Sequence, residues 1–134
     1  MGRRVRQLLE QYAGPKLRFC APDIAYLDAE TYLPGLLSKR GKSSVDLRPS
    51  LEYLRFLVEP VDRETYSPFE NEARERLRGR DEEDWPVLAT SLAFQCPIWT
   101  EDTDFFGIGV AVWTSNRIEI YLKGQTRPSE LGEQ

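Results

Sequence analysis

The chain has 134 residues, of which 40% are hydrophobic and 30% are charged, and its formal net charge is -4. This composition is typical of one soluble globular domain, and it argues against a disordered chain or a surface that binds nucleic acid through charge alone. Histidine is absent, which excludes Ser-His-Asp and Cys-His nucleophile pairs and histidine-based zinc sites, so any catalysis must rest on carboxylates.

No targeting or redox signal stands out along the chain. No apolar run reaches the roughly 18 residues that a membrane helix needs. The basic N-terminal segment lacks the apolar core and the cleavage site of a signal peptide, so we expect a cytoplasmic protein without membrane partners. Cys20 and Cys96 are not arranged as Cys-x-x-Cys, and we expect two buried thiols that behave as small apolar side chains.

The first half of the chain alternates helical and extended segments. Helical spacing of apolar residues ends at Gly14 and Pro15, and Pro22 suits the first turn of a second helix that ends near Arg40 and bends at Pro34. The expected elements are a helix over 3–13, a strand over 16–21, a helix over 22–40, a polar loop over 41–44, a helix over 47–57 and a short strand or extended link over 58–62.

The second half repeats this alternation. A charged helix ends at Gly79, and a helix that begins at or near Asp81 leads into an apolar strand. The expected elements are helices over 64–78 and 81–94, strands over 95–100 and 109–114, and a terminal helix over 116–122. Strands separated by helices indicate an α/β fold with a mostly parallel sheet. We expect a single domain over 1–123 and a polar, disordered tail over 124–134.

The sequence WTEDTDFF, residues 99–106, places three acids at the end of a predicted buried strand. Glu101, Asp102 and Asp104 lie where α/β sheets bind ligands, beyond the carboxyl end of a strand. Like charges beside a core are costly unless a cation lies among them. The helix before this strand begins with RDEED and runs back along the sheet, which brings Asp84 to the same end as Asp102. Clustered carboxylates without histidine favour Mg²⁺ or Mn²⁺.

Each acid also has a purely structural explanation. Capping and the helix dipole account for two of the four acids in 81–84, and an Asx turn accounts for those in 101–104. Thr100 either touches a metal-bound water or phosphate, or bonds within the turn. Taken singly, structure and function are equally good explanations; taken together, the acids favour a metal site.

Basic and aromatic residues offer a second set of candidates. The four arginines at 74, 76, 78 and 80 lie near the acids in sequence and suit phosphate, although i,i+4 pairing with glutamates favours a solvated helix face. We assign only Arg80 a weak role in RNA binding. Trp85, Trp99 and Trp113 suit base stacking, but each lies in an apolar segment and core packing is the better explanation.

Residues 80–122 resemble the C-terminal half of a PIN domain, the fold of many metal-dependent ribonucleases and of bacterial toxin nucleases. The resemblance rests on Asp84 opening a helix that carries Ala89 and Ala93, followed by a strand and by Thr-x-Asp-x-Asp-Phe at 100–105. Residues 21–37 are similar to the second helix of the family, so the resemblance extends over about 3–122. It implies a three-layer αβα fold around a mostly parallel central sheet.

The resemblance also implies a function and its residues. The chain would be a Mg²⁺- or Mn²⁺-dependent endoribonuclease, a hydrolase with Asp84, Asp102 and Asp104 as metal-binding and catalytic residues. Asp28 stands where the family has glutamate and would be a weaker ligand, because it is one methylene shorter. Asp81 and Thr100 would lie next to these ligands without binding the metal ion directly. Toxin-type relatives pair with small inhibitory, antitoxin-like proteins and form homodimers, which makes both expected partners beside RNA.

One departure from the family concerns the sheet. Family members begin with a central apolar strand that carries the first metal-binding aspartate, and here the chain begins at MGRRVRQLL, which resembles the helix after that strand. We expect unpaired backbone and a slot in the core, and a chain that is a truncated form of a longer protein; alternatively, neighbouring strands close the gap or a partner supplies the strand. Loss of this aspartate would weaken metal binding or activity. The alternative function is an inactive PIN-like module that binds a partner protein or RNA.

Overall fold

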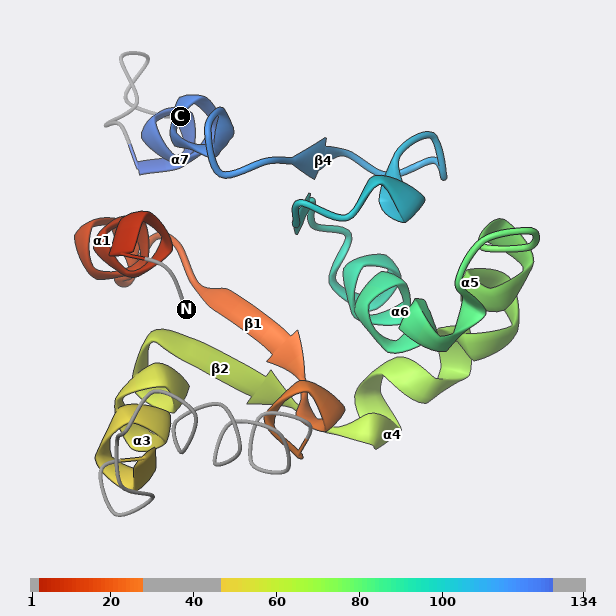
Figure 1. The fold of residues 1–134 in the computed structure, drawn as a ribbon, viewed down its shortest axis with the longest axis horizontal. Coiled ribbons are helices and arrows are strands. Elements are labelled where there is room, and N and C mark those ends of the chain that lie inside the picture. The colour runs from red at the N-terminus through yellow and green to blue at the C-terminus, as the bar shows by residue number, and fades with distance from the viewer. Residues whose placement is uncertain (1–2, 28–46, 127–134) are drawn as a thin grey trace, which may run out of the picture.

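The computed structural model describes residues 3–27 and 47–126, with side chains described in 3–27 and 52–126 (Figure 1). The first described helix is α1 (Arg3–Tyr12), and strand β1 (Phe19–Pro22) follows it. Residues 23–27 are helical, as expected after Pro22, and the remainder of the predicted helix over 22–40, the predicted loop over 41–44 and Asp28 lie outside the described residues. Helix α3 (Leu47–Leu57) then leads directly into strand β2 (Val58–Val61).

The second half is mainly helical. Its elements are α4 (Arg63–Tyr66), the 3-10 turn η2 (Ser67–Phe69), α5 (Glu70–Arg76), the 3-10 turn η3 (Glu82–Asp84), α6 (Trp85–Phe94), β3 (Ile98–Trp99), the 3-10 turn η4 (Thr103–Phe105), β4 (Val112–Trp113) and α7 (Ile118–Thr126). The predicted continuous helix over 64–78 is wrong in one respect, because Pro68 lies in the 3-10 turn that separates α4 from α5. A proline removes a helix hydrogen bond and clashes with the preceding turn.

The strands form two separate parallel pairs. Strand β1 pairs with β2, with Phe19 opposite Val58, and β3 pairs with β4, with Ile98 opposite Val112. The prediction of an α/β fold with parallel strands is confirmed. Within the described ranges, however, the two pairs are not joined by backbone hydrogen bonds into one sheet.

Strands β3 and β4 are shorter than the predicted segments over 95–100 and 109–114. Gln95 takes a left-handed conformation (φ 54°) at the end of α6, and Pro97 has no N–H to donate. Gly109 has φ +88°, a conformation that does not fit a strand. In each segment, the residues near the N-terminus therefore form the turn that leads into the strand.

Helices cover the strands on two faces, giving the three layers of an αβα fold. On one face, α4, α5 and α6 supply a core that includes the fully buried Tyr66, Leu77 and Leu88. On the other face, α1 and α7 pack together through Leu8, Tyr12, Ile118 and Leu122, and aromatic side chains from the strands cover this cluster. Tyr12 Oη donates a 2.6 Å hydrogen bond to Glu119, which fastens α1 to α7.

The expected end of the terminal helix was near residue 122, and α7 continues to Thr126. Residues 127–134 of the predicted tail lie outside the described part of the chain. Over residues 3–27 and 47–126, no helix combines the length and the apolar character that a membrane span requires.

Candidate metal centre

Two segments that are far apart along the chain bring three carboxylates together. Asp84 lies at the junction of η3 and α6, and Asp102 and Asp104 lie in and beside η4, which follows β3. One carboxylate oxygen from each of the three residues lies within 4.8 Å of the other two. Among the described acids and cysteines, this is a group able to hold a metal ion.

Local structure fixes the orientation of the acidic turn. The Asp102 carboxylate accepts a 2.9 Å hydrogen bond from the Asp104 N–H, and the Asp102 N–H donates to Thr100 Oγ1 over 3.0 Å. These are the short-range bonds expected of an Asx turn and of a threonine at the end of a strand. The first bond uses one carboxylate oxygen of Asp102 and the second uses the hydroxyl of Thr100, so the other carboxylate oxygen of Asp102 takes no part in the turn. Turn formation and metal binding therefore do not exclude each other at this residue.

On the other side of the cluster, Asp81 holds the entrance to α6. Its side chain caps η3 by accepting a 3.1 Å hydrogen bond from the Glu83 N–H. Asp84 comes three residues later and has no capping bond from its own side chain. The structural explanation therefore applies to Asp81, whereas Asp84 directs its charge toward the other acids.

The electrostatic environment of Asp84 is unfavourable for its ionised carboxylate. Partial burial, followed by the negative charges of Asp81 and Asp102, raises the pKa of the Asp84 carboxyl to about 6. Both causes penalise the ionised form of this carboxylate. A divalent cation placed among the three acids would remove the repulsion and favour ionisation.

Arginines fasten the loop that carries the acids to the rest of the fold. Arg80 Nη1 donates to the carbonyl of Asp104 over 2.8 Å and also to the carbonyl of Phe106. Arg76 Nη1 donates to the carbonyl of Ile108 over 3.0 Å. The sequence suggested Arg80 as an RNA contact, and it gave no signal for these carbonyl contacts, which join residues 24 and 32 positions apart.

The other side-chain contacts near this edge hold the fold together and are not part of the three-acid group. The predicted i,i+4 pairs are present, with Arg74 2.7 Å from Glu70 and Arg76 2.6 Å from Glu72. Glu101 accepts a 2.7 Å bond from the Ser115 N–H, so it joins the ends of β3 and β4 and is not part of the three-acid group. Beyond the end of β1, Asp23 accepts a 2.6 Å bond from Tyr66 Oη, a role that the sequence did not suggest.

The three tryptophans have the positions expected of packing residues. Trp85 is buried, its ring centroid lies 5.6 Å from that of Tyr66, and two arginine side chains cover its face. Trp99 is half-buried and its Nε1 donates to Ser115 Oγ over 3.0 Å. Trp113 is half-buried against Tyr121, with ring centroids 5.8 Å apart.

Comparison with known protein families finds a match over most of the chain. The family model described as PIN domain matches residues 1–123. No curated protein and no solved structure matches the sequence. Because the family model covers well over half of the 134 residues, the chain belongs to the PIN domain family.

Proposed function

We propose that this protein is a divalent-metal-dependent endoribonuclease that hydrolyses RNA phosphodiester bonds, with Mg²⁺ or Mn²⁺ held by Asp84, Asp102 and Asp104. Membership of a family of nucleases supports the reaction class. The single observation that carries the assignment of residues is the meeting of three carboxylate oxygens within 4.8 Å.

The donor set fits a hard divalent cation. Mg²⁺ binds oxygen ligands at about 2.0–2.1 Å, so two ligands of one ion lie no more than about 4.2 Å apart. The oxygens of Asp84, Asp102 and Asp104 lie within 4.8 Å of one another, so small side-chain rotations would bring them to the separation that one Mg²⁺ requires. An ion bound here would activate a water molecule and neutralise charge on the scissile phosphate.

The side chains around the site have distinct roles in this proposal. The Asx turn at Asp102 and the carbonyl bonds from Arg80 hold the acidic loop in one conformation before metal or substrate binds. Such preorganisation lowers the free energy needed to assemble a charged site. Asp81 contributes negative charge next to Asp84 and caps the helix, and Thr100 fixes the backbone of the loop. Asp28 is proposed as a further, weaker ligand.

RNA binding at this edge requires cationic groups near the acids. Arg80 is exposed, and the two carbonyl bonds use one of its three guanidinium nitrogens. A guanidinium has five N–H donors, and its fork suits a phosphate. We therefore place the RNA backbone beside Arg80, with the cleaved phosphate at the three acids.

The test combines metal binding with cleavage. Mg²⁺ and Mn²⁺ are titrated into the wild type and into Asp102→Asn while the melting temperature is recorded, and cleavage of single-stranded RNA is measured in the same solutions. We expect the metal to raise the wild-type melting temperature, because a ligand of the native state stabilises it, and the substitution to remove both effects. Glu82→Gln is the control, since Glu82 is an exposed acid of η3, the turn that carries Asp84, and is not a member of the three-acid group.

Two results would contradict this function. An unchanged metal response in Asp102→Asn would show that the ligands lie elsewhere. A metal response without cleavage of any RNA would instead support an inactive PIN-like module that binds RNA or a partner protein.

A further inference from the structure

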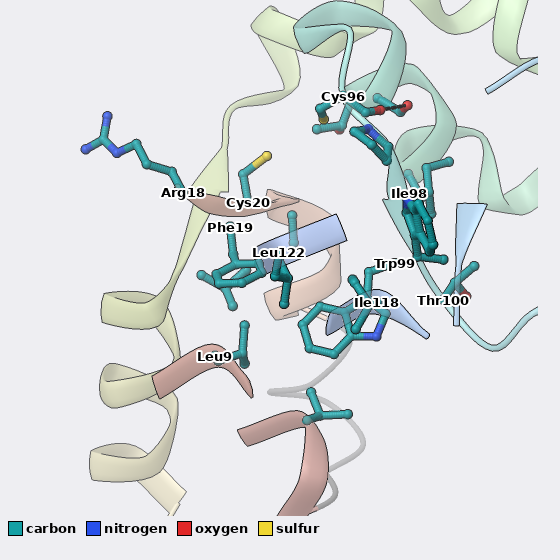
Figure 2. A pocket seen from close by; sticks show the side chains of 18 of the residues that line it. Leu9, Arg18, Phe19, Cys20, Cys96, Ile98, Trp99, Thr100, Ile118 and Leu122 are labelled. Carbon is teal, nitrogen blue, oxygen red and sulfur yellow. Dashed lines mark hydrogen bonds between the residues drawn. The ribbon is translucent and has the colours of Figure 1, made fainter. Parts of the chain in front are cut away.

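Two cysteines that are far apart in the sequence meet in a groove between the two strand pairs. The groove has a volume of about 500 Å³, and Cys20 and Cys96 both line it (Figure 2). Cys20 belongs to β1, whereas Cys96 lies in the turn between α6 and β3. Both are free, half-buried thiols, and their side chains are hydrogen-bonded to each other. The sequence has two cysteines, so this contact involves both thiols of the chain.

Regular backbone structure holds each thiol in place. Cys20 lies opposite Glu59 in the parallel pairing of β1 with β2. The Cys96 N–H donates to the Ser91 carbonyl over 3.2 Å, and Ser91 Oγ donates to the Cys96 carbonyl. Gln95, in the left-handed conformation that ends α6, turns the chain into this position. The fold itself therefore brings the two sulfur atoms together.

The contact makes the two thiols chemically unequal. The hydrogen bond from the Cys20 thiol lowers the pKa of Cys96 to about 7. The same bond, followed by burial and by the negative charges of Cys96 and Glu59, raises the pKa of Cys20. The thiolate is the nucleophilic form of cysteine, so near neutral pH Cys96 supplies a nucleophile beside a protonated thiol. Redox-sensitive cysteines commonly combine a thiolate of low pKa with a second thiol next to it.

Metal binding is the other chemistry that paired thiols serve in proteins. Structural zinc sites use four protein ligands, and catalytic zinc sites use three. Within the described residues, neither cysteine belongs to a group of three possible metal ligands, and the sequence has no histidine. The pair is therefore better suited to redox chemistry than to zinc.

We propose that Cys20 and Cys96 form a peroxide-reactive dithiol site, which a hydroperoxide converts into a disulfide between β1 and the turn before β3. With hydrogen peroxide, the Cys96 thiolate attacks one oxygen, the O–O bond breaks, and a sulfenic acid and hydroxide form. The Cys20 sulfur then attacks the Cys96 sulfur, so that the S–S bond forms, the S–O bond breaks and the leaving hydroxide takes the Cys20 proton. The two sulfurs lose two electrons and the peroxide gains them. With the proton that Cys96 released on ionisation, the products are one disulfide and two water molecules.

The disulfide would link the two strand pairs covalently. Within the described residues these pairs share no backbone hydrogen bonds, and the contact between the rings of Phe19 and Trp99 lies between them. A cross-link between two positions so far apart in the sequence restricts the unfolded chain and therefore stabilises the folded state. The inference does not rest on the proposed nuclease activity, because neither cysteine belongs to the three-acid group.

Oxidation of the full chain by hydrogen peroxide tests this site. The reduced protein at pH 7.5 receives up to ten equivalents of peroxide, and the intact mass, the free thiols and a tryptic digest without reductant are recorded. We expect the loss of both thiols, a mass lower by two hydrogens and one disulfide between the tryptic peptides 19–39 and 81–117. Dithiothreitol should restore the starting mass. The disulfide form should melt about 5 °C or more above the reduced form.

Two serine variants separate the roles of the cysteines. Cys20→Ser keeps a hydroxyl donor beside Cys96 but removes the second thiol, so we expect peroxide to leave a sulfenic acid on Cys96 that dimedone traps. In the wild type, dimedone at the same concentration should trap little, because Cys20 is already in contact and reacts first. In Cys96→Ser, Cys20 should react with peroxide about fivefold more slowly than Cys96 does in Cys20→Ser, because less of it is ionised.

Several results would overturn the proposal. Thiols that persist at ten equivalents of peroxide, or sulfinic acids that form without a disulfide, would show that the pair is not a dithiol site. Disulfide-linked dimers in place of the linkage within one chain would show that the two sulfurs do not meet in solution. Equal dimedone trapping of Cys96 in the wild type and in Cys20→Ser would show that Cys20 is not placed to react. A disulfide form that melts no higher than the reduced protein would show that the native fold does not accommodate the bond.

Discussion

At the scale of single residues, the charge of Asp84 opposes folding unless a cation is present. Its folded-state pKa is raised from 3.8 to about 6 by burial and neighbouring acids. A raised carboxyl pKa means that stability is lost as the pH rises from the unfolded value through the folded value. The metal-free protein therefore carries the full penalty above about pH 6, and a metal ion removes it.

The substitution Asp84→Asn tests this penalty. In EDTA at pH 7.5 we expect the variant to be more stable than the wild type by about 1 kcal/mol, a value reduced from the full pKa shift because the side chain is partly exposed. At pH 5 about half of this advantage remains, because wild-type Asp84 is then largely protonated in the folded state but ionised in the unfolded state. Thermal denaturation at the two pH values measures the difference, and Glu82→Gln is the control. A variant less stable than the wild type at pH 7.5 would show that Asp84 is bonded more favourably than proposed.

Cys20 of β1 interacts with Cys96, which follows α6, and the sequence did not suggest this contact. The hydrogen bond from the Cys20 thiol lowers the pKa of Cys96 to about 7, and the same bond, together with burial, raises the pKa of Cys20. Both side chains are only partly buried, so the expectation of two buried thiols is wrong. The thiolate is the reactive form of cysteine.

Alkylation by iodoacetamide as a function of pH measures this effect. We expect the labelling of Cys96 to have its midpoint near pH 7 and the labelling of Cys20 to need a much more alkaline solution. In Cys20→Ala, the midpoint for Cys96 moves up toward the ordinary value of about 8.5, because the stabilising donor is gone. Equal midpoints for the two residues in the wild type would contradict the assignment.

At the scale of elements, the sequence predicted which segments are helices and strands better than it predicted their ends. The helical spacing of apolar residues identified α1, which buries Leu8, Leu9 and Tyr12 on one face. The split at Pro68 and the short strands β3 and β4 depend on single backbone conformations that periodicity does not encode. The convergence of Asp84 and Asp102 was predictable because a helix and the strand after it run antiparallel. The contacts of Arg76 and Arg80 were not, because they depend on the path of a loop.

The loop after η4 gives an element-scale prediction. Gly109 and Gly79 both have positive φ, +88° and +82°, but a Cβ atom on Gly109 would lie 2.6 Å from Arg76 Nη1, whereas one on Gly79 meets nothing within 4 Å. Both alanine variants lose stability through backbone strain. Gly109→Ala also displaces Arg76 from the Ile108 carbonyl, and we expect it to cost about 1 kcal/mol more than Gly79→Ala. Urea denaturation of the two variants measures the difference, and equal losses would show that Arg76 adjusts without losing its bond.

At the scale of the whole molecule, the fold is a three-layer structure whose middle layer is divided. The helical layers are continuous, since α6 contacts both β1 and β3 and α1 packs against α7 (Figure 1). The ring of Phe19 in β1 also contacts the ring of Trp99 in β3, and the two ring centroids are 5.8 Å apart. Helix packing and this aromatic contact therefore hold the two strand pairs together in place of backbone hydrogen bonds. From the resemblance alone we expected a slot in the core, and the alternative, closure of the gap by the neighbouring strands, does not hold within the described residues.

A divided middle layer has a measurable consequence for backbone protection in the protein alone. Amides bonded within a parallel pair exchange slowly, because exchange requires that the pair opens. The Thr100 amide donates to Trp113 over 3.0 Å, whereas the amide of the preceding residue is directed to the open edge. We therefore expect the Trp99 amide to exchange at least tenfold faster than the Thr100 amide, as measured by hydrogen–deuterium exchange with residue resolution. Equal protection of the two amides would mean that the open edge of β3 is paired in solution and that the middle layer is not divided there.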